Sequence, residues 1–181
     1  MSRRTATVLL LLLGAAAPLS AQAGDPAASG CVRGEAAPLL RADAHGRFRR
    51  LPAGAGWLSE ETAPLAEGDT VRIFQGGCES YVLGVELDLR APRGDPRRPR
   101  GWLRRAAAYL RALDARLAEP GPLREAAAAL DARAAAAPPP TYGDEIVVGD
   151  SNLIATTVRV ERPRARGGRI RLLVTRATGP L

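Results

Sequence analysis

The sequence contains no lysine, a single histidine and only two cysteines, and each shortage excludes a class of chemistry. Without lysine the chain has no P-loop amine, no Schiff-base amine and no serine–lysine dyad. His45 alone cannot form a multi-histidine metal site, so we expect neither a metal nor a cofactor. Aromatic residues make up only 4% of the chain, and none alternates with the arginines as a base-stacking platform, so nucleic acid is not an expected partner.

The N-terminus carries the pattern of an export signal. Two arginines precede an apolar run from Ala6 to Leu13, and small residues follow as far as Ala23. This order is typical of a secretory signal peptide over residues 1–23, which predicts export, most simply to the periplasm. The apolar run is too short to span a membrane, which takes about 20 residues, and no later run approaches that length. We therefore expect no integral membrane segment after cleavage.

The two cysteines, Cys31 and Cys78, both lie in the part of the chain that is predicted to be exported. In an oxidising compartment they predict one disulfide, for which the chain-entropy model gives ~4 kcal/mol of stabilisation. The alternative at Cys31 is lipidation, since residues 28–31 (ASGC) resemble the end of a lipobox. Leucine is missing three positions before Cys31, so the anchored lipoprotein is the minority hypothesis.

The chain after the signal, residues 24–181, is long enough for one domain with its own core. An irregular lead-in over 24–45 precedes a β-hairpin over 69–90, where apolar residues alternate. Apolar residues then recur at helical spacing over 101–136, with a break at Pro-Gly-Pro, and alternate again in a β-meander over 144–176. This grouping predicts an α+β fold, in which a mostly antiparallel sheet of about five strands carries a two-helix hairpin on one face.

Several aromatic and acidic residues have a structural interpretation. Tyr81 and Trp102 occupy apolar positions of their periodic segments, so we expect them in the core. The adjacent acids at 60–61, 86–88 and 144–145 are predicted to be exposed on strands or loops. No pair among them is marked out as the two carboxylates of a glycosidase.

The stretch VVGDSN, residues 147–152, resembles the first block of the GDSL/SGNH hydrolases. That resemblance implies a nucleophilic role for Ser151 at the end of a strand. The later blocks of the family supply a Gly, an Asn and a C-terminal Asp-x-x-His, but no Asp or His follows Asn152. His45 would have to provide the base from the other end of the chain. A serine hydrolase is therefore the least favoured hypothesis, and we predict that Ser151 occupies an exposed turn.

Arginine is concentrated in one segment. Seven arginines and a single acid, Asp95, lie between Arg90 and Arg105, and the whole chain has a formal net charge of +7. The segment is either a solvated loop, whose arginines reflect the codon usage of a GC-rich genome, or a patch that binds lipid headgroups, lipopolysaccharide or an acidic protein. The candidate binding residues are Arg93, Arg97, Arg98, Arg100, Arg104 and Arg105.

Together these features predict a small exported binding or accessory protein of the cell envelope, without enzymatic activity. It would recognise its partner, an unidentified envelope protein, through a surface, as inhibitors do. The alternative is a peripheral module that holds anionic lipid or lipopolysaccharide through the arginine segment. The turn at residues 75–79, which contains Gly76 and Gly77, is the second candidate surface.

Overall fold

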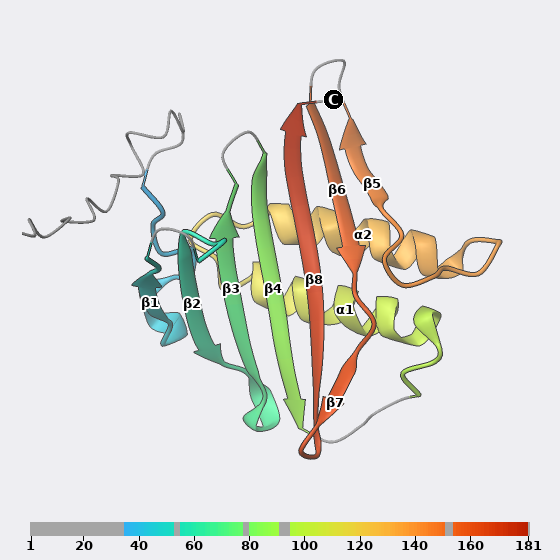
Figure 1. Ribbon diagram of the computed structural model, residues 1–181, viewed down its shortest axis with the longest axis horizontal. Helices are drawn as coiled ribbons and strands as arrows, with labels where there is room; N and C mark the ends of the chain where they lie inside the picture. The colour runs from blue at the N-terminus through green and yellow to red at the C-terminus, as the bar shows by residue number, and fades with distance from the viewer. Residues whose placement is uncertain (1–34, 53–54, 78–79, 91–94, 151–153, 181) are drawn as a thin grey trace, which may run out of the picture.

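The computed structural model describes residues 35–52, 55–77, 80–90, 95–150 and 154–180. Within them the chain forms one sheet of eight strands with two helices packed on one face (Figure 1). The predicted α+β architecture is confirmed, although the sheet has more than the five strands expected. The strands are β1 (Arg47–Arg50), β2 (Ser59–Pro64), β3 (Thr70–Gly76), β4 (Tyr81–Arg90), β5 (Ile146–Asp150), β6 (Ile154–Val160), β7 (Arg164–Arg166) and β8 (Arg169–Pro180).

The C-terminal strand lies at the centre of the sheet. The strand order is β1-β2-β3-β4-β8-β6-β5, every recorded pairing is antiparallel, and the short β7 pairs with the first part of β8. β8 pairs with the whole length of β4, from Tyr81 opposite Thr178 to Arg90 opposite Arg169. It therefore joins the strands that precede the helices to those that follow them.

β2 is a strand that the sequence pattern does not predict, because its residues SEETAP do not alternate between apolar and polar. The expectation that the acids at 60–61 are exposed is wrong: Glu60 is 6% exposed and Glu61 is 3% exposed. A Glu61 carboxylate oxygen accepts hydrogen bonds from the backbone N–H groups of Leu39 and Leu40, at 2.8 and 3.2 Å. The buried carboxylate thus fastens the lead-in segment to the sheet, which compensates its burial.

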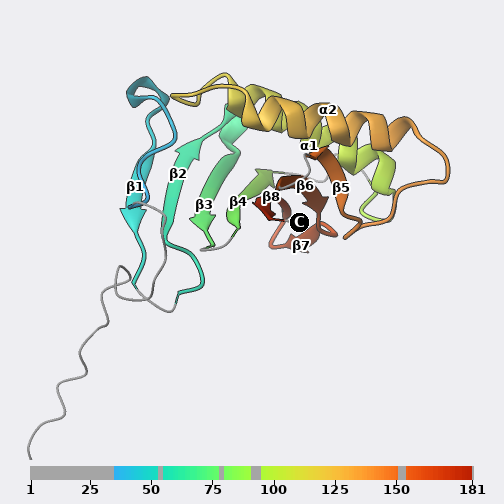
Figure 2. The ribbon, with the colours of Figure 1, turned by 90° about the horizontal axis from the view of Figure 1, so that it is seen from above.

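The two helices, α1 (Pro99–Asp114) and α2 (Pro122–Ala135), both begin with proline. Proline suits the first turn because its fixed φ is already helical and its missing N–H would have had no partner there. Figure 2 shows both helices lying in one layer across the same face of the sheet. The opposite side of the sheet, which we call the open face, carries no helix among the described residues.

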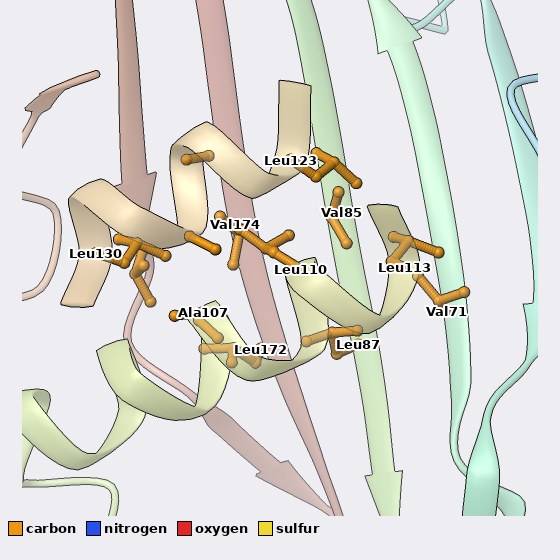
Figure 3. Packing of buried hydrophobic residues seen from close by; sticks show 14 of the residues in the cluster. Val71, Val85, Leu87, Ala107, Leu110, Leu113, Leu123, Leu130, Leu172 and Val174 are labelled. Carbon is orange, nitrogen blue, oxygen red and sulfur yellow. The ribbon is translucent and has the colours of Figure 1, made fainter. Parts of the chain in front are cut away.

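The core lies between the helices and the sheet (Figure 3). Leu110 and Leu113 of α1 meet strand side chains such as Leu87, and Leu123 and Leu130 extend the layer along α2. Small buried residues on the helices allow their backbones to approach closely, and the two helices make extensive contact. Trp102 is 2% exposed, as the periodicity predicted, and Tyr81 packs at the border of the core.

A single buried carboxylate joins the two helices. Asp114, the last residue of α1, is 0% exposed. Its Oδ1 accepts hydrogen bonds from the backbone N–H groups of Gly121, Leu123 and Arg124, at 2.8, 3.1 and 3.2 Å. These donors lie at the N-terminal end of α2, where the first N–H groups of a helix lack the usual intrahelical acceptor four residues earlier, and Arg124 also donates to the Gly121 carbonyl at 3.0 Å. Asp114 therefore caps α2 from the end of α1 and fixes the angle of the hairpin.

On the open face, the connection between β1 and β2 folds back so that Trp57 covers two glycines. A Cβ atom at Gly76 would lie 2.8 Å from Trp57 Cε3, and one at Gly84 would lie 3.0 Å from Trp57 Cη2. The Phe74 ring lies beside the indole, with 5.5 Å between centroids. Glycine is needed at these strand positions because the Trp57 indole occupies the volume that their side chains would otherwise fill.

Candidate functional site

The arginines predicted as a patch lie around the start of α1. Arg97 and Arg98 precede the helix, while Arg100, Arg104 and Arg105 belong to its first two turns. Arg93 lies outside the described residues. Asp95 accepts a hydrogen bond at 2.9 Å from the Arg97 backbone N–H, and its carboxylate lies 3.9 Å from Arg98 Nε.

Two of these arginines have roles inside the fold. The Arg100 guanidinium donates a 2.9 Å hydrogen bond to the carbonyl of Ala136, at the C-terminal end of α2. The Arg105 guanidinium lies over the ring of Trp102, 4.8 Å from the ring centroid. The first contact joins α1 to the end of α2 by capping an orphan carbonyl, and the second is a cation–π interaction within α1. The predicted segment is therefore partly structural.

A second group of arginines gathers on the open face where β4, β7 and β8 meet, at the lower end of the sheet in Figure 1. Arg169 lies directly opposite Arg90 on one side and Arg166 on the other, and Arg171 lies opposite Arg164. Like charges in directly opposed positions of a sheet repel each other. We call this group the hairpin arginines: Arg90, Arg164, Arg166, Arg169 and Arg171.

Only part of this positive charge is neutralised within the protein. Arg169 donates hydrogen bonds to the carboxylate and the carbonyl of Asp88, at 2.7 and 2.9 Å. Arg171 Nε lies 4.0 Å from a Glu86 carboxylate oxygen. Arg90, Arg164 and Arg166 are exposed and form no side-chain ion pair among the described residues. The lower end of the open face therefore carries positive charge that no described acid balances.

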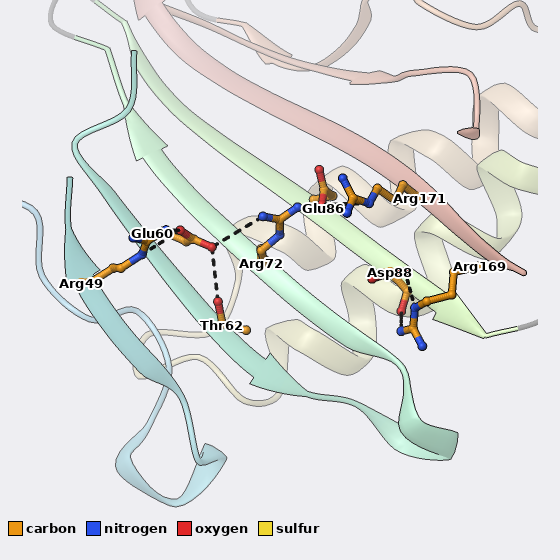
Figure 4. Close-up of polar contacts among 8 residues, drawn as sticks. All are labelled: Arg49, Glu60, Thr62, Arg72, Glu86, Asp88, Arg169 and Arg171. Carbon is orange, nitrogen blue, oxygen red and sulfur yellow. Dashed lines mark hydrogen bonds and ion pairs between the residues drawn. The ribbon is translucent and has the colours of Figure 1, made fainter. Parts of the chain in front are cut away.

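Further along the open face, arginines and acids form a row of ion pairs across the strands (Figure 4). Glu60 accepts hydrogen bonds from Arg49, the Nε bond being 2.9 Å long, and its other oxygen lies 3.8 Å from Arg72. Arg72 also donates to Glu86 on β4. Glu60 is thus committed to Arg49 and Arg72, and Glu86 is shared between Arg72 and Arg171, so these acids neutralise the hairpin arginines only in part.

Tyr142 contacts the segment that leads into α1. Its hydroxyl donates a 2.9 Å hydrogen bond to the carbonyl of Pro96, in the segment that leads into α1. Burial raises the pKa of the Tyr142 phenol to about 12, the nearby Arg162 lowers it in part, and Asp95 raises it further. Arg162 lies two residues before β7. Tyr142 is therefore near both the segment that leads into α1 and the segment that leads into β7.

Sequence reasoning missed the hairpin arginines because Arg90 is far from the other four along the chain. A local signal was nevertheless present in RPRARGGRIR, residues 162–171, where arginine occupies every second position on both sides of Gly167-Gly168. Side chains two apart on a strand share a face, so this spacing in a hairpin places the arginines together.

The groups that a serine hydrolase would need lie only partly within the described residues. Ser151 and the turn predicted for it lie outside the described residues, as do Cys31 and Cys78. His45 is exposed and has a left-handed backbone, with φ of 54°, at the end of the short 3-10 helix Ala42–Ala44. Asp144 is held by Thr141 and Arg133, and the Thr141 hydrogen bonds lower its pKa.

No group of histidine, cysteine and acidic side chains in the described part of the chain could hold a metal ion. None of the helices there is both long and apolar enough to cross a membrane. Comparisons of the chain with protein-family models, with curated proteins and with solved structures find no match.

Proposed function

We propose that this protein is a non-enzymatic binding protein whose hairpin arginines hold an anionic lipid surface. The observation that carries the proposal is the register of β4, β8 and β7, which sets arginine directly opposite arginine. Such an arrangement opposes folding, and local conflicts of this kind are found where a surface serves a partner. An external phosphate layer removes the repulsion, because each phosphate can accept a fork of guanidinium hydrogen bonds.

The predicted export of the chain is consistent with this partner. Outside the cytoplasm, phosphate is presented most densely by lipid headgroups, and exposed basic residues bind such surfaces additively. The arginines at the start of α1 contribute less in this proposal, because Arg100 donates to the Ala136 carbonyl and Arg105 lies over the Trp102 ring. The binding surface is therefore centred on β7 and β8, with the start of α1 at its margin.

The test is sedimentation of the protein with vesicles of phosphatidylglycerol and phosphatidylcholine, compared with vesicles of phosphatidylcholine alone. We expect binding to the anionic vesicles only, with release at 1 M salt, where the Debye length is about 3 Å. The double variant R164Q/R166Q should bind roughly thirtyfold more weakly, on the basis of the usual contribution of a basic residue at an anionic surface.

The matched control is R41Q/R47Q, which removes the same charge near β1, at the far edge of the sheet. It should bind as the wild-type protein does. Equal losses in the two double variants would show that binding follows net charge alone and would contradict the proposed site. A larger loss in R97Q/R98Q than in R164Q/R166Q would place the site at the start of α1 instead.

A further inference from the structure

An arginine lies on the helix-facing side of the sheet, among core positions of the central strand. In β8, Ile170, Leu172 and Val174 are buried beneath the helices, and alternation places Arg176 on the same face. Its neighbours across the two adjoining strands are Leu83, 5% exposed, and Val158, 0% exposed. Arg176 therefore continues an apolar row with a permanent positive charge.

Among the described residues, the Arg176 guanidinium has no anionic partner. Its Nη1 donates a 3.1 Å hydrogen bond to Thr178 Oγ1. Its Nε is buried and has no hydrogen-bond partner in the described part of the chain, where no carboxylate lies within ion-pair distance either. By contrast, Arg72, Arg169 and Arg171 on the open face all have acidic partners. A partly buried guanidinium without an anion is costly, since charges leave water at little expense only when they are paired.

Beyond the guanidinium, the next positions on the same face of the sheet carry hydroxyl groups. The Thr156 and Thr178 hydroxyl oxygens lie 3.0 Å apart on neighbouring strands. One proton suffices for that contact, so the second hydroxyl can donate elsewhere. Tyr81 lies opposite Thr178, and its hydroxyl donates to Gln75 Oε1 at 3.3 Å. Arg176 and these threonines therefore offer hydrogen-bond donors and one positive charge.

The next residues along the same face are apolar and exposed. Ile154 is the next residue beyond Thr156 on this face, about 7 Å away towards the start of β6, and is 51% exposed. The exposed Pro180 lies opposite it on β8. This end of β8 extends beyond α2, at the top of Figure 1. From the core outward, the surface therefore changes from a guanidinium to hydroxyls and then to an apolar rim.

We propose that Arg176 is the anchor of a binding site for an aliphatic carboxylate. The carboxylate would accept hydrogen bonds from the Nη atoms of Arg176, as well as one from a threonine hydroxyl. The hydrocarbon chain would lie over Ile154 and Pro180. A carboxylate suits the site better than a phosphate monoester, because one guanidinium balances a single negative charge and a phosphate carries nearly two. This site is separate from the lipid-binding surface proposed above, which lies on the open face.

The test is isothermal titration of the protein with octanoate and with octanamide, which has the same chain but no charge. We expect saturable binding of octanoate and at least tenfold weaker binding of octanamide. R176Q should bind octanoate at least tenfold more weakly, whereas R171Q, on the opposite face of the same strand, should bind it as the wild type does. R176Q should still bind anionic vesicles normally, which separates this proposal from the previous one.

Three results would overturn the assignment. These are equal binding of octanoate by R176Q and wild type, equal binding of octanamide and octanoate, or displacement of octanoate by equimolar inorganic phosphate. If R176Q does not fold, T178V provides the second test, since it removes the hydroxyl that orients the guanidinium. Unchanged octanoate binding by folded T178V would then contradict the site.

Discussion

Replacement of Asp114 by alanine should destabilise the protein more than any surface substitution. The side chain is 0% exposed, and its Oδ1 accepts three backbone hydrogen bonds from the start of α2. Hydrogen bonds to charged groups contribute about 1.5–3 kcal/mol each, and a buried donor without a partner costs about 1–3 kcal/mol. Water can reach Gly121 and Arg124, which are partly exposed or exposed, but not the buried Leu123, so the three terms do not add fully.

We therefore expect D114A to lower the free energy of unfolding by about 3 kcal/mol and Tm by roughly 6–12 °C for a chain of this size. D114N keeps an acceptor oxygen of the same shape and should cost about 1 kcal/mol, because it loses the charge and the 3.3 Å ion pair with the exposed Arg124 but keeps the acceptor. The measurement is urea and thermal unfolding followed by circular dichroism.

The matched control is D131A, which breaks the exposed 2.6 Å ion pair with Arg111 between the same two helices. Exposed pairs contribute about 0–1 kcal/mol, so this variant should remain close to the wild type. A loss from D114A no larger than the loss from D131A would show that α2 does not depend on the cap. The account of how the helical hairpin is fixed would then be wrong.

Two further predictions concern the open face and Tyr142. G84V should displace Trp57 from its position over β3 and β4 and so increase acrylamide quenching of tryptophan fluorescence. G149V is the control and should leave the quenching unchanged, because a Cβ atom added there meets nothing within 4 Å. Equal quenching in G84V and wild type would contradict the packing of Trp57. Because the Tyr142 pKa is raised to about 12 from an ordinary 10, the stability that its neutral form contributes is complete below pH 10 and is lost as the pH rises to 12. Y142F should lose less stability than the wild type between pH 10 and 12 in denaturant titrations, and parallel losses would show that the phenol titrates normally.

Sequence reasoning predicted the fold where periodicity is strong. The change from alternation in β4 to helical spacing from Trp102, and back to alternation after Tyr142, was enough to define the sheet and the helix pair. β2 escaped prediction because two of its buried residues are glutamates, which are buried because other segments donate to them or pair with them. Such partners are far apart in sequence, so no local pattern reveals them.

The candidate site was predicted only in part for a related reason. A run of arginines such as Arg97, Arg98 and Arg100 is visible locally, yet the structure commits one of these guanidiniums to the end of α2. The position of Arg90 opposite Arg169 depends on a strand register between residues about 80 apart, which the sequence does not specify locally. Arg176 was likewise overlooked, because an arginine after an apolar strand is typical of a strand end.

The central claim is that the hairpin arginines lie opposite one another because together they bind an external anionic surface. It is tested most directly by measuring vesicle affinity and the free energy of unfolding in one variant, R166Q, which removes a charge that lies directly opposite Arg169. The account predicts that R166Q binds phosphatidylglycerol vesicles more weakly while its free energy of unfolding is unchanged or higher, because a repulsive pair has been removed. Undiminished vesicle binding together with a lower free energy of unfolding would show that Arg166 stabilises the fold, and would contradict the claim.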